Sequence, residues 1–182
     1  MLLGRYENFP DNVHNLFLCY HNVPTKSLQQ TILCTFYRLN KESFDLGAIT
    51  PFLRRDCKVS FEFGIANGFD FNFLDQNELV QCLKVVEEKE ARVLDFFCAI
   101  RYHVIKEGKK VIPLRFDYHI NRFIFHDSKL ETRIRHEKGI RRVPVDELME
   151  FVVNQINIEL SKVKLNPLVL SNENKVRKEF SD

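Results

Sequence analysis

The sequence predicts an α+β domain in which a mainly antiparallel or mixed β-sheet packs against three helices. Three segments, near residues 25–40, 75–90 and 144–160, space apolar residues three or four positions apart, as one face of a helix requires. Between these segments apolar and polar residues alternate, which is typical of strands with one buried face. The order of elements favours helices packed mainly on one face of the sheet. We expect one domain over residues 1–170 and a mobile tail over residues 171–182.

The first expected elements are a strand over residues 13–22 and the helix that follows it. Pro, Thr and Ser within residues 24–27 supply the chemistry of a helix start. The apolar face of this helix comprises Leu28, Ile32, Phe36 and Leu39. Asn40 suits the end of the helix, and residues 44–49 suit a short strand.

Two phenylalanine-rich runs flank an Asn-Gly pair and predict a β-hairpin. A three-residue loop over residues 66–68, with Gly68 left-handed, pairs Ile65 with Phe69 and keeps the rings on one face, which burial should favour. An exposed aromatic face could stack nucleobases. Acidic residues on the opposite face would repel a phosphate backbone, so core packing is the favoured interpretation. The rings concerned are Phe61, Phe63, Phe69, Phe71 and Phe73.

A second helix, capped by Asp75, precedes two long antiparallel strands. Alternation extends over residues 94–104 and resumes over residues 112–120, after a polar turn at residues 106–110. The apolar phase slips near residues 121–122, which predicts a bulge or a turn there.

A short polar strand over residues 130–137 and a final helix that begins near Pro144 complete the prediction. The portion up to about residue 105 has the element order of a split β-α-β-β-α-β unit of ferredoxin-like type. C-terminal hairpins and the final helix would extend this unit.

The composition is that of an ordinary globular protein, with 45% hydrophobic residues, 29% charged residues and a formal net charge of +2. This near balance favours neither nucleic acid nor an acidic ligand. The five cysteines are widely spaced without a C-x-x-C pair, which argues against a disulfide framework or a zinc ribbon and suits the cytoplasm. No signal peptide, membrane-spanning run or Gly-rich phosphate loop is recognisable, so neither a membrane nor a cofactor is expected.

The best functional lead is a basic segment, residues 133–142, with five Lys or Arg in ten residues against 27 in 182 overall. Its candidate anion-binding residues are Arg133, Arg135, Lys138, Arg141 and Arg142. On a strand, Arg133 and Arg135 project to one face, and Gly139 lets the chain bend. Clustered guanidinium groups match phosphate oxygens in shape and charge. The alternative is a solvated edge strand whose charges prevent edge-to-edge pairing.

The middle hairpin supplies a second group of candidates: Arg101, His103, Arg115, Asp117 and His119. With the apolar set facing inward, these five share the outer face, and if Val104 pairs with Ile112 the two arginines lie opposite each other. Two facing cations need an anion between them, so both could extend the anion-binding surface. Asp117 and His119 are candidate catalytic residues as an acid–base pair, or could supply two metal ligands. A polar sheet face with local ion pairs is the alternative.

Three classes of function follow from these observations. The first is a binding protein that engages nucleic acid or another phosphate-bearing partner through the basic residues. The second is a phosphoester hydrolase that uses Asp117 and His119, and the third is a non-catalytic subunit that assembles as a homo-oligomer. No sequence motif selects among them, so the sequence leaves open whether the chain is an enzyme.

Overall fold

The structure, a computed structural model, describes residues 3–51, 57–105 and 111–171. The strands are β1 (Asn15–Tyr20), β2 (Ser43–Asp45), β3 (Cys57–Asn67), β4 (Asp70–Phe73), β5 (Val93–Ile105), β6 (Val111–Phe125), β7 (Lys129–Gly139) and β8 (Val169–Leu170). The helices are α1 (Thr25–Leu39), α2 (Leu46–Ile49), α3 (Gln76–Glu88) and α4 (Val145–Lys162). The predicted α+β class is confirmed.

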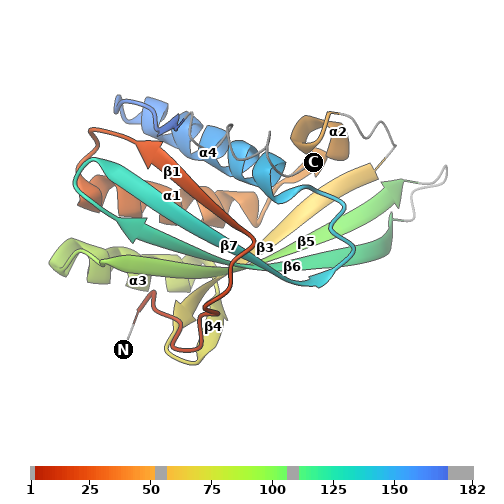
Figure 1. The fold of residues 1–182 in the computed structure, drawn as a ribbon, viewed down its shortest axis with the longest axis horizontal. Coiled ribbons are helices and arrows are strands. Elements are labelled where there is room, and N and C mark those ends of the chain that lie inside the picture. Colours follow the sequence, from red (N-terminus) through yellow and green to blue (C-terminus); the bar gives the residue numbers. More distant parts are fainter. Residues whose placement is uncertain (1–2, 52–56, 106–110, 172–182) are drawn as a thin grey trace.

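All eight strands belong to one sheet, in the order β2-β3-β5-β6-β7-β1-β8, with β4 paired to β3. Every pair of these strands is antiparallel, as the sequence predicts. β3 pairs with residues 98–104 of β5, whereas β7 pairs through its residues 130–139 with residues 117–125 of β6, towards the other end of the β5–β6 ribbon. The sheet twists about its two long central strands, β5 and β6 (Figure 1). β3 lies beside β5 on one side of this pair, and β7 lies beside β6 on the other.

Two parts of the predicted order differ from the structure. β1 lies between β7 and β8, away from β3 and β5, so the first portion of the chain does not form a ferredoxin-like unit. Residues 43–45 pair with β3 as a strand, but the chain then forms the single helical turn α2 instead of continuing as a strand to residue 49. This turn places Leu46 and Ile49 together in the core, at the spacing that only a helix provides.

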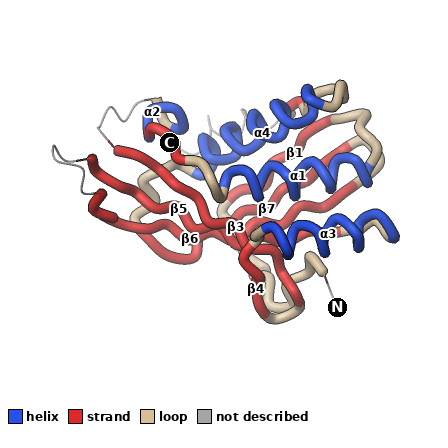
Figure 2. Tube along the Cα trace, turned by 180° about the vertical axis from the view of Figure 1, so that it is seen from behind, coloured by secondary structure: helices blue, strands red, loops and turns tan. Residues whose placement is uncertain are grey.

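The three longer helices cover one face of the sheet, with α1 between α3 and α4 (Figure 2). Phe36 of α1 stacks on Phe63 of β3 at a ring-centroid distance of 4.1 Å and meets Phe96 of β5 edge-on at 4.7 Å. The predicted apolar face of α1 is entirely buried. Burying each such ring contributes about 1.5–3 kcal/mol, so this aromatic cluster anchors the helix layer. Among the helices of the described ranges, none is long and apolar enough to cross a bilayer.

Asn40 and Asp75 mark helix ends, as the sequence predicts. The Asn40 side chain bonds β3 twice, accepting from the Phe63 N–H at 2.6 Å and donating to the Phe63 carbonyl at 3.0 Å. Asp75 accepts the backbone N–H of Glu78 at 2.9 Å, an N-cap that satisfies one free helix donor. Pro144 occupies the N-cap of α4 and lies just before its first turn.

The β3–β4 hairpin has a different register from the predicted one. Ile65 does not pair with Phe69, because the loop comprises only Gly68 and Phe69. Gly68 does adopt a left-handed φ of +75°. Phe71 consequently faces away from the helices, where it packs against Tyr6 at 4.7 Å. The N-terminal segment pairs with this hairpin and provides that partner.

The five rings of the hairpin thus occupy three environments. Phe61 and Phe63 are core residues, as predicted, whereas Phe71 lies on the face of the sheet without helices. Phe69 and Phe73 are 69% and 54% exposed. The prediction that all five share one buried face is wrong, because the register pairs Ile65 with Asn72 and thereby turns Phe71 and Phe73 to the opposite face.

A register shift between β5 and β6 decides which side chains of β6 face the helices. Val104 pairs with Ile112, as expected, but the ladder is irregular between Tyr102 and His103. Beyond the shift Arg101 lies opposite Phe116, so the expected pair of facing arginines is not formed.

The shift lies beside Pro113, whose missing N–H cannot join the ladder. It places five alternate residues of β6 on the helix side, where all are buried: Asp117, His119, Asn121, Phe123 and Phe125. The prediction that Asp117 and His119 share the outer face is therefore wrong. So is the predicted slip near residues 121–122, because pairing is continuous there.

Candidate functional site

Asp117, in the middle of β6, is the centre of a buried hydrogen-bond network beside the end of β7. Its carboxylate accepts the Tyr102 hydroxyl at 2.6 Å, His136 Nε2 at 3.0 Å and the backbone N–H groups of Arg141 at 2.7 Å and Arg142 at 3.1 Å. Burial alone would raise the pKa of Asp117, but these hydrogen bonds hold it below its ordinary value. The carboxylate is fully buried and charged, with its oxygens already paired.

The chain reaches this carboxylate through the bend at Gly139. Gly139 has a φ of +117°, and a Cβ there would lie 2.3 Å from the Phe116 carbonyl oxygen and 2.4 Å from Asp117 Oδ1. Arg141 also has a positive φ, of 50°, which aims successive N–H groups at one anion. The sequence predicts that Gly139 bends the chain, and the structure confirms it.

The Arg141 side chain extends the network to two histidines. Its Nε donates to His136 Nδ1 at 3.2 Å, which is consistent with His136 Nε2 donating to Asp117. Its Nη2 lies 2.6 Å from Nε2 of His14, whose Nδ1 accepts the backbone N–H of His136. Burial and the positive charge of Arg141 lower the pKa of His14. The sequence gives no sign of His14, because only the β1–β7 pairing brings it here.

His119 lies beside this network without joining it. Its ring meets His136 edge-on at a centroid distance of 5.0 Å, and neither of its buried nitrogens has a hydrogen-bond partner among the residues that the structure describes. Burial, helped by the neighbouring His136, lowers its pKa to about 4, so the ring is neutral at pH 7. Cys98 is its neighbour across the ladder, and burial raises the pKa of that thiol, which makes it unreactive.

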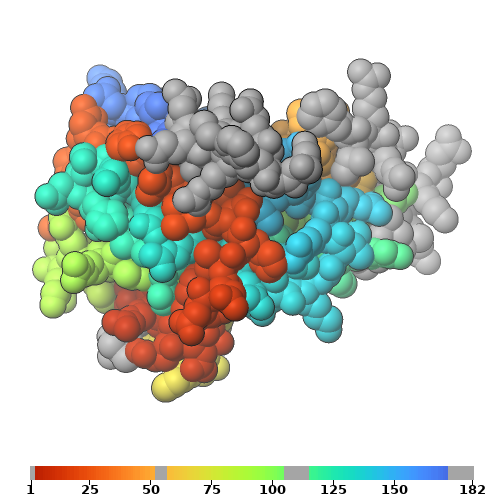
Figure 3. Space-filling view, viewed as in Figure 1, coloured from red at the N-terminus to blue at the C-terminus, as the bar shows by residue number. Residues whose placement is uncertain are grey.

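The arginines of the basic segment on β7 are paired with carboxylates. Arg133 Nε lies 2.6 Å from Glu131, and Arg135 Nε lies 3.6 Å from Glu137. Arg135 also donates to the carbonyl of Asn12, which belongs to the N-terminal segment beside β7 on the surface (Figure 3). β7 lies between β6 and β1, so it is not an edge strand and its charges do not protect an edge.

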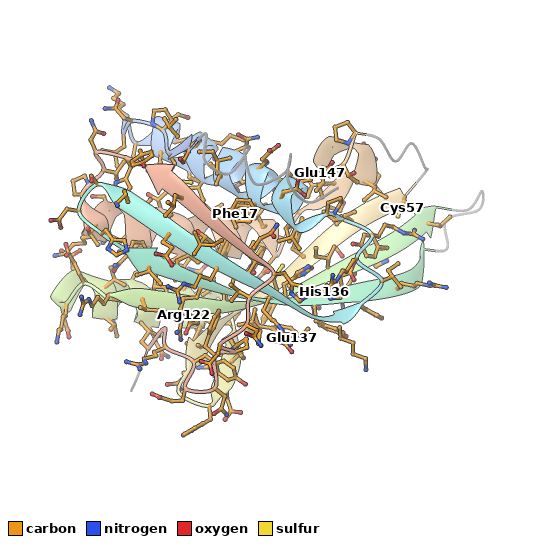
Figure 4. The ribbon with its side chains drawn as sticks, viewed as in Figure 1. Phe17, Cys57, Arg122, His136, Glu137 and Glu147 are labelled. Atoms are coloured by element: carbon orange, nitrogen blue, oxygen red, sulfur yellow. The ribbon has the colours of Figure 1, made fainter. Side chains whose placement is uncertain are left out.

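The remaining basic candidates divide between the two faces of the sheet. Arg101 faces outward and pairs with Glu62 at 2.7 Å, and Lys138 is exposed opposite Tyr118. Arg142 turns back over the Tyr102 ring at 5.6 Å, on the other side, where Arg115 aligns with Tyr102. The neighbouring residues His136 and Glu137 of β7, both labelled in Figure 4, differ in the same way, because His136 joins the buried network and Glu137 is exposed. The seven candidates therefore do not converge on one surface.

A row of aromatic rings crosses the outer face, which the helices leave uncovered. Phe71 lies 5.8 Å from Phe97, Phe97 stacks with Tyr118 at 5.5 Å, and Tyr118 stacks with Phe116 at 6.1 Å. The Arg101 guanidinium lies over the Phe116 ring at 5.3 Å. Phe116 is 37% exposed. The alternation over residues 112–120 predicts an inward apolar face that includes Phe116 and Tyr118, but the register shift between β5 and β6 turns both rings outward.

No protein-family model, no curated protein and no solved structure matches this chain. Within the described ranges, no three His, Cys, Asp or Glu side chains gather closely enough to hold a metal ion.

The two faces of the sheet therefore suit different roles. On the inner face, the Asp117 carboxylate ties the turn after Gly139 to β5, β6 and β7, so that α4 begins in a fixed position. On the outer face, Phe116 and Tyr118 expose ring surface beside Arg101 and Lys138, and Lys138 has no ion pair among the residues that the structure describes. Stacking surface next to cationic groups can hold unpaired bases together with their phosphates.

Proposed function

We propose that the protein is a non-enzymatic binding protein that engages single-stranded nucleic acid through the outer face of its sheet. The observation that carries the proposal is the stacked row of Phe97, Tyr118 and Phe116, with Arg101 over its exposed end. Every base has a π face, so such a row binds bases without reading their sequence. In a duplex the bases stack on each other and cannot stack on the aromatic row, so the row would bind single strands.

The charges around the row support a phosphate backbone beside the bases. Lys138 lies across the ladder from Tyr118 and forms no ion pair within the described part of the chain. Arg101 pairs with Glu62, but both side chains are about two-fifths exposed. An ion pair this exposed contributes about 0–1 kcal/mol, so a phosphate can take the place of the carboxylate. Arg133 and Arg135 lie on the same face of β7 and would extend the contact with the phosphate backbone, because a phosphate could likewise replace their carboxylate partners.

Fluorescence anisotropy with labelled single-stranded oligonucleotides tests the proposal. Phe116→Ala should weaken binding roughly 5- to 150-fold, because stacking contributes about 1–3 kcal/mol per base. Phe69→Ala is the matched control, since this ring is 69% exposed at the β3–β4 loop, outside the row. Its affinity should equal that of the unchanged protein.

The salt dependence supplies a second, electrostatic readout. The logarithm of the binding constant should fall linearly with that of the salt concentration, with a slope of about −0.7 per phosphate contacted. Lys138→Gln should reduce the slope by about that amount. Failure to bind single strands at low salt, or equal losses for Phe116→Ala and Phe69→Ala, would refute the proposal.

The phosphoester-hydrolase alternative has less support. Asp117 accepts four hydrogen bonds and is fully buried, and the His119 ring is also inaccessible. A general base must reach the proton that it removes. Hydrolysis of a phosphoester that is lost in both Asp117→Asn and His119→Gln variants, with the fold intact by circular dichroism, would reverse this preference.

Assembly as a homo-oligomer through a sheet edge also has limited support. β2 and β8 end the strand order, and they contain three and two residues. Short edge strands offer few backbone groups to a partner. Light scattering at micromolar concentration checks this directly, and a dimer would favour the assembly role.

A further inference from the structure

A cleft of about 730 Å³ lies at one end of the sheet, away from the aromatic row. It forms where α3 ends, β5 begins and the β6–β7 turn reverses the chain, beside the start of α1 (Figure 1). Its volume falls within the range of about 300–1,000 Å³ that is usual for small-molecule sites.

The cleft is held in shape by backbone hydrogen bonds on several sides. Gln29 of α1 is fully buried, and its amide clamps Ala91 by donating to the carbonyl at 2.5 Å and accepting the N–H at 3.0 Å. The Phe125 N–H donates to the carbonyl of Arg92 at 3.1 Å, and Gly4 accepts the N–H of Asp95 at 2.6 Å. A fixed frame lowers the entropy lost when a ligand binds.

The lining is apolar inside and cationic at the rim. Phe125 is 8% exposed, and Val85 and Val93 are half-buried. Lys89 and Arg92 are exposed in the connection between α3 and β5. The inner part therefore suits an apolar group, and the rim suits a polar head.

The cations of the rim are unpaired, unlike the arginines of β7. Lys89 and Arg92 form no side-chain hydrogen bond or ion pair with any other residue in the described part of the chain, and Arg5 interacts only through its charge with the buried Asp95. Arg133 and Arg135, by contrast, both have carboxylate partners. The cationic groups that are free to meet a ligand therefore gather at the cleft more than at the basic segment.

The net field at the cleft favours an anion. Glu90 and Asp127 also line it, so the fixed charges are three positive and two negative, 3 − 2 = +1, before His126 is counted. The start of α1, where Thr25 lines the cleft, has no acidic residue in its first turn and no side-chain cap. The positive end of the helix dipole therefore adds to the attraction.

We propose that this cleft binds a small organic anion, an apolar body that carries one phosphate or carboxylate group. The apolar body would lie against Val85, Val93 and Phe125, and the anionic group against Lys89 and Arg92. This site is separate from the aromatic row, so it does not depend on the nucleic-acid proposal.

Binding of 8-anilinonaphthalene-1-sulfonate, an aromatic anion whose fluorescence rises on burial, tests the site in the full chain. Phenyl phosphate and phenylacetate should displace the probe at concentrations about tenfold lower than benzyl alcohol or benzylamine, which have similar rings without negative charge. Whichever of the two anions displaces the probe at the lower concentration assigns the head group as phosphate or carboxylate. Equal displacement by all four compounds, or no binding of the probe, would overturn the proposal.

The double variant Lys89→Gln, Arg92→Gln should weaken binding of the probe about tenfold or more, and more at low salt than at high salt. Lys84→Gln is the matched control, because Lys84 is an exposed cation of α3 that does not line the cleft. Amide chemical-shift changes on addition of phenyl phosphate should centre on residues 89–93. Changes centred elsewhere, or a double variant that binds like the control, would refute the site. Oligonucleotide binding should not change in the double variant, so failure of either proposal is distinguishable from failure of the other.

Discussion

Replacing His119 by leucine is expected to flatten the dependence of stability on pH between pH 7 and pH 5. The folded protein holds the ring neutral with a pKa of about 4, whereas the ordinary value is 6.5. As the pH falls through this interval, the unfolded chain binds a proton that the folded chain does not. Because the folded pKa is the lower one, the stabilisation is present above pH 6.5 and is lost as the pH falls towards 4.

The size of the effect follows from the two pKa values. Protonation of His119 in the unfolded chain should lower the free energy of unfolding by about 2 kcal/mol between pH 7 and pH 5, and by about 3 kcal/mol once the pH is below 4. The side chain is fully buried, so no solvent screening reduces this figure. For a urea m-value of about 2 kcal/mol/M, the midpoint should move by about 1 M between pH 7 and pH 5.

Urea unfolding followed by circular dichroism at the two pH values measures the effect. For each protein, the loss of unfolding free energy between pH 7 and pH 5 is measured, and the loss in the variant is compared with that in the unchanged protein. The cost of the substitution itself at pH 7 cancels in this comparison. His14 and His21, whose pKa values are also lowered by burial, remain in both proteins and cancel as well. His126→Asn is the control, because its ring is 49% exposed at the β6–β7 turn. If His119→Leu loses as much stability as the unchanged protein between pH 7 and pH 5, the assignment of a buried neutral ring is wrong.

Three further substitutions test the network and the helix ends. Gly139→Ala should cost several kcal/mol in urea unfolding, on the order of 3 or more, because its Cβ would lie 2.3 Å from the Phe116 carbonyl oxygen at a left-handed φ. Tyr102→Phe should cost about 1–3 kcal/mol, since it removes one buried donor to Asp117; a neutral result would mean that the hydroxyl is dispensable. Asp75→Ala should lower the free energy of unfolding by about 1 kcal/mol through loss of the α3 cap, and Asp75→Asn should restore most of it.

Several local elements are predictable from the sequence because short-range spacing specifies them. The apolar positions of α1 repeat at helical intervals, and all of them are buried where that pattern places them. Asp75 marks the start of α3 by the chemistry of its own side chain, and Asn40 stands at the end of α1, where the sequence places it. Gly139 bends the chain because it lacks a Cβ, which is a property of one residue.

The candidate site depends on features that no local pattern specifies. The ladder irregularity beside Pro113 reverses the faces of β6, which buries Asp117 and His119 and exposes Phe116. Side chains alternate along a strand, so a shift of one position moves every following residue to the opposite face. The sequence identified Asp117 and His119 as candidates but assigned them to the wrong face of the sheet.

Long-range pairing decides the rest. The place of β1 beside β7 brings His14 to His136 across the whole chain, and the same pairing makes the basic segment an interior strand. The cleft lined by Arg5, Lys89 and Arg92 likewise combines segments that are distant in sequence. By itself the sequence determined the three longer helices, most of the strands and the bend at Gly139, because backbone geometry and side-chain spacing act over a few residues. Only the tertiary structure decided which face each side chain of β6 occupies and which segments meet at the cleft, because strand order and register act between residues that are far apart in the chain.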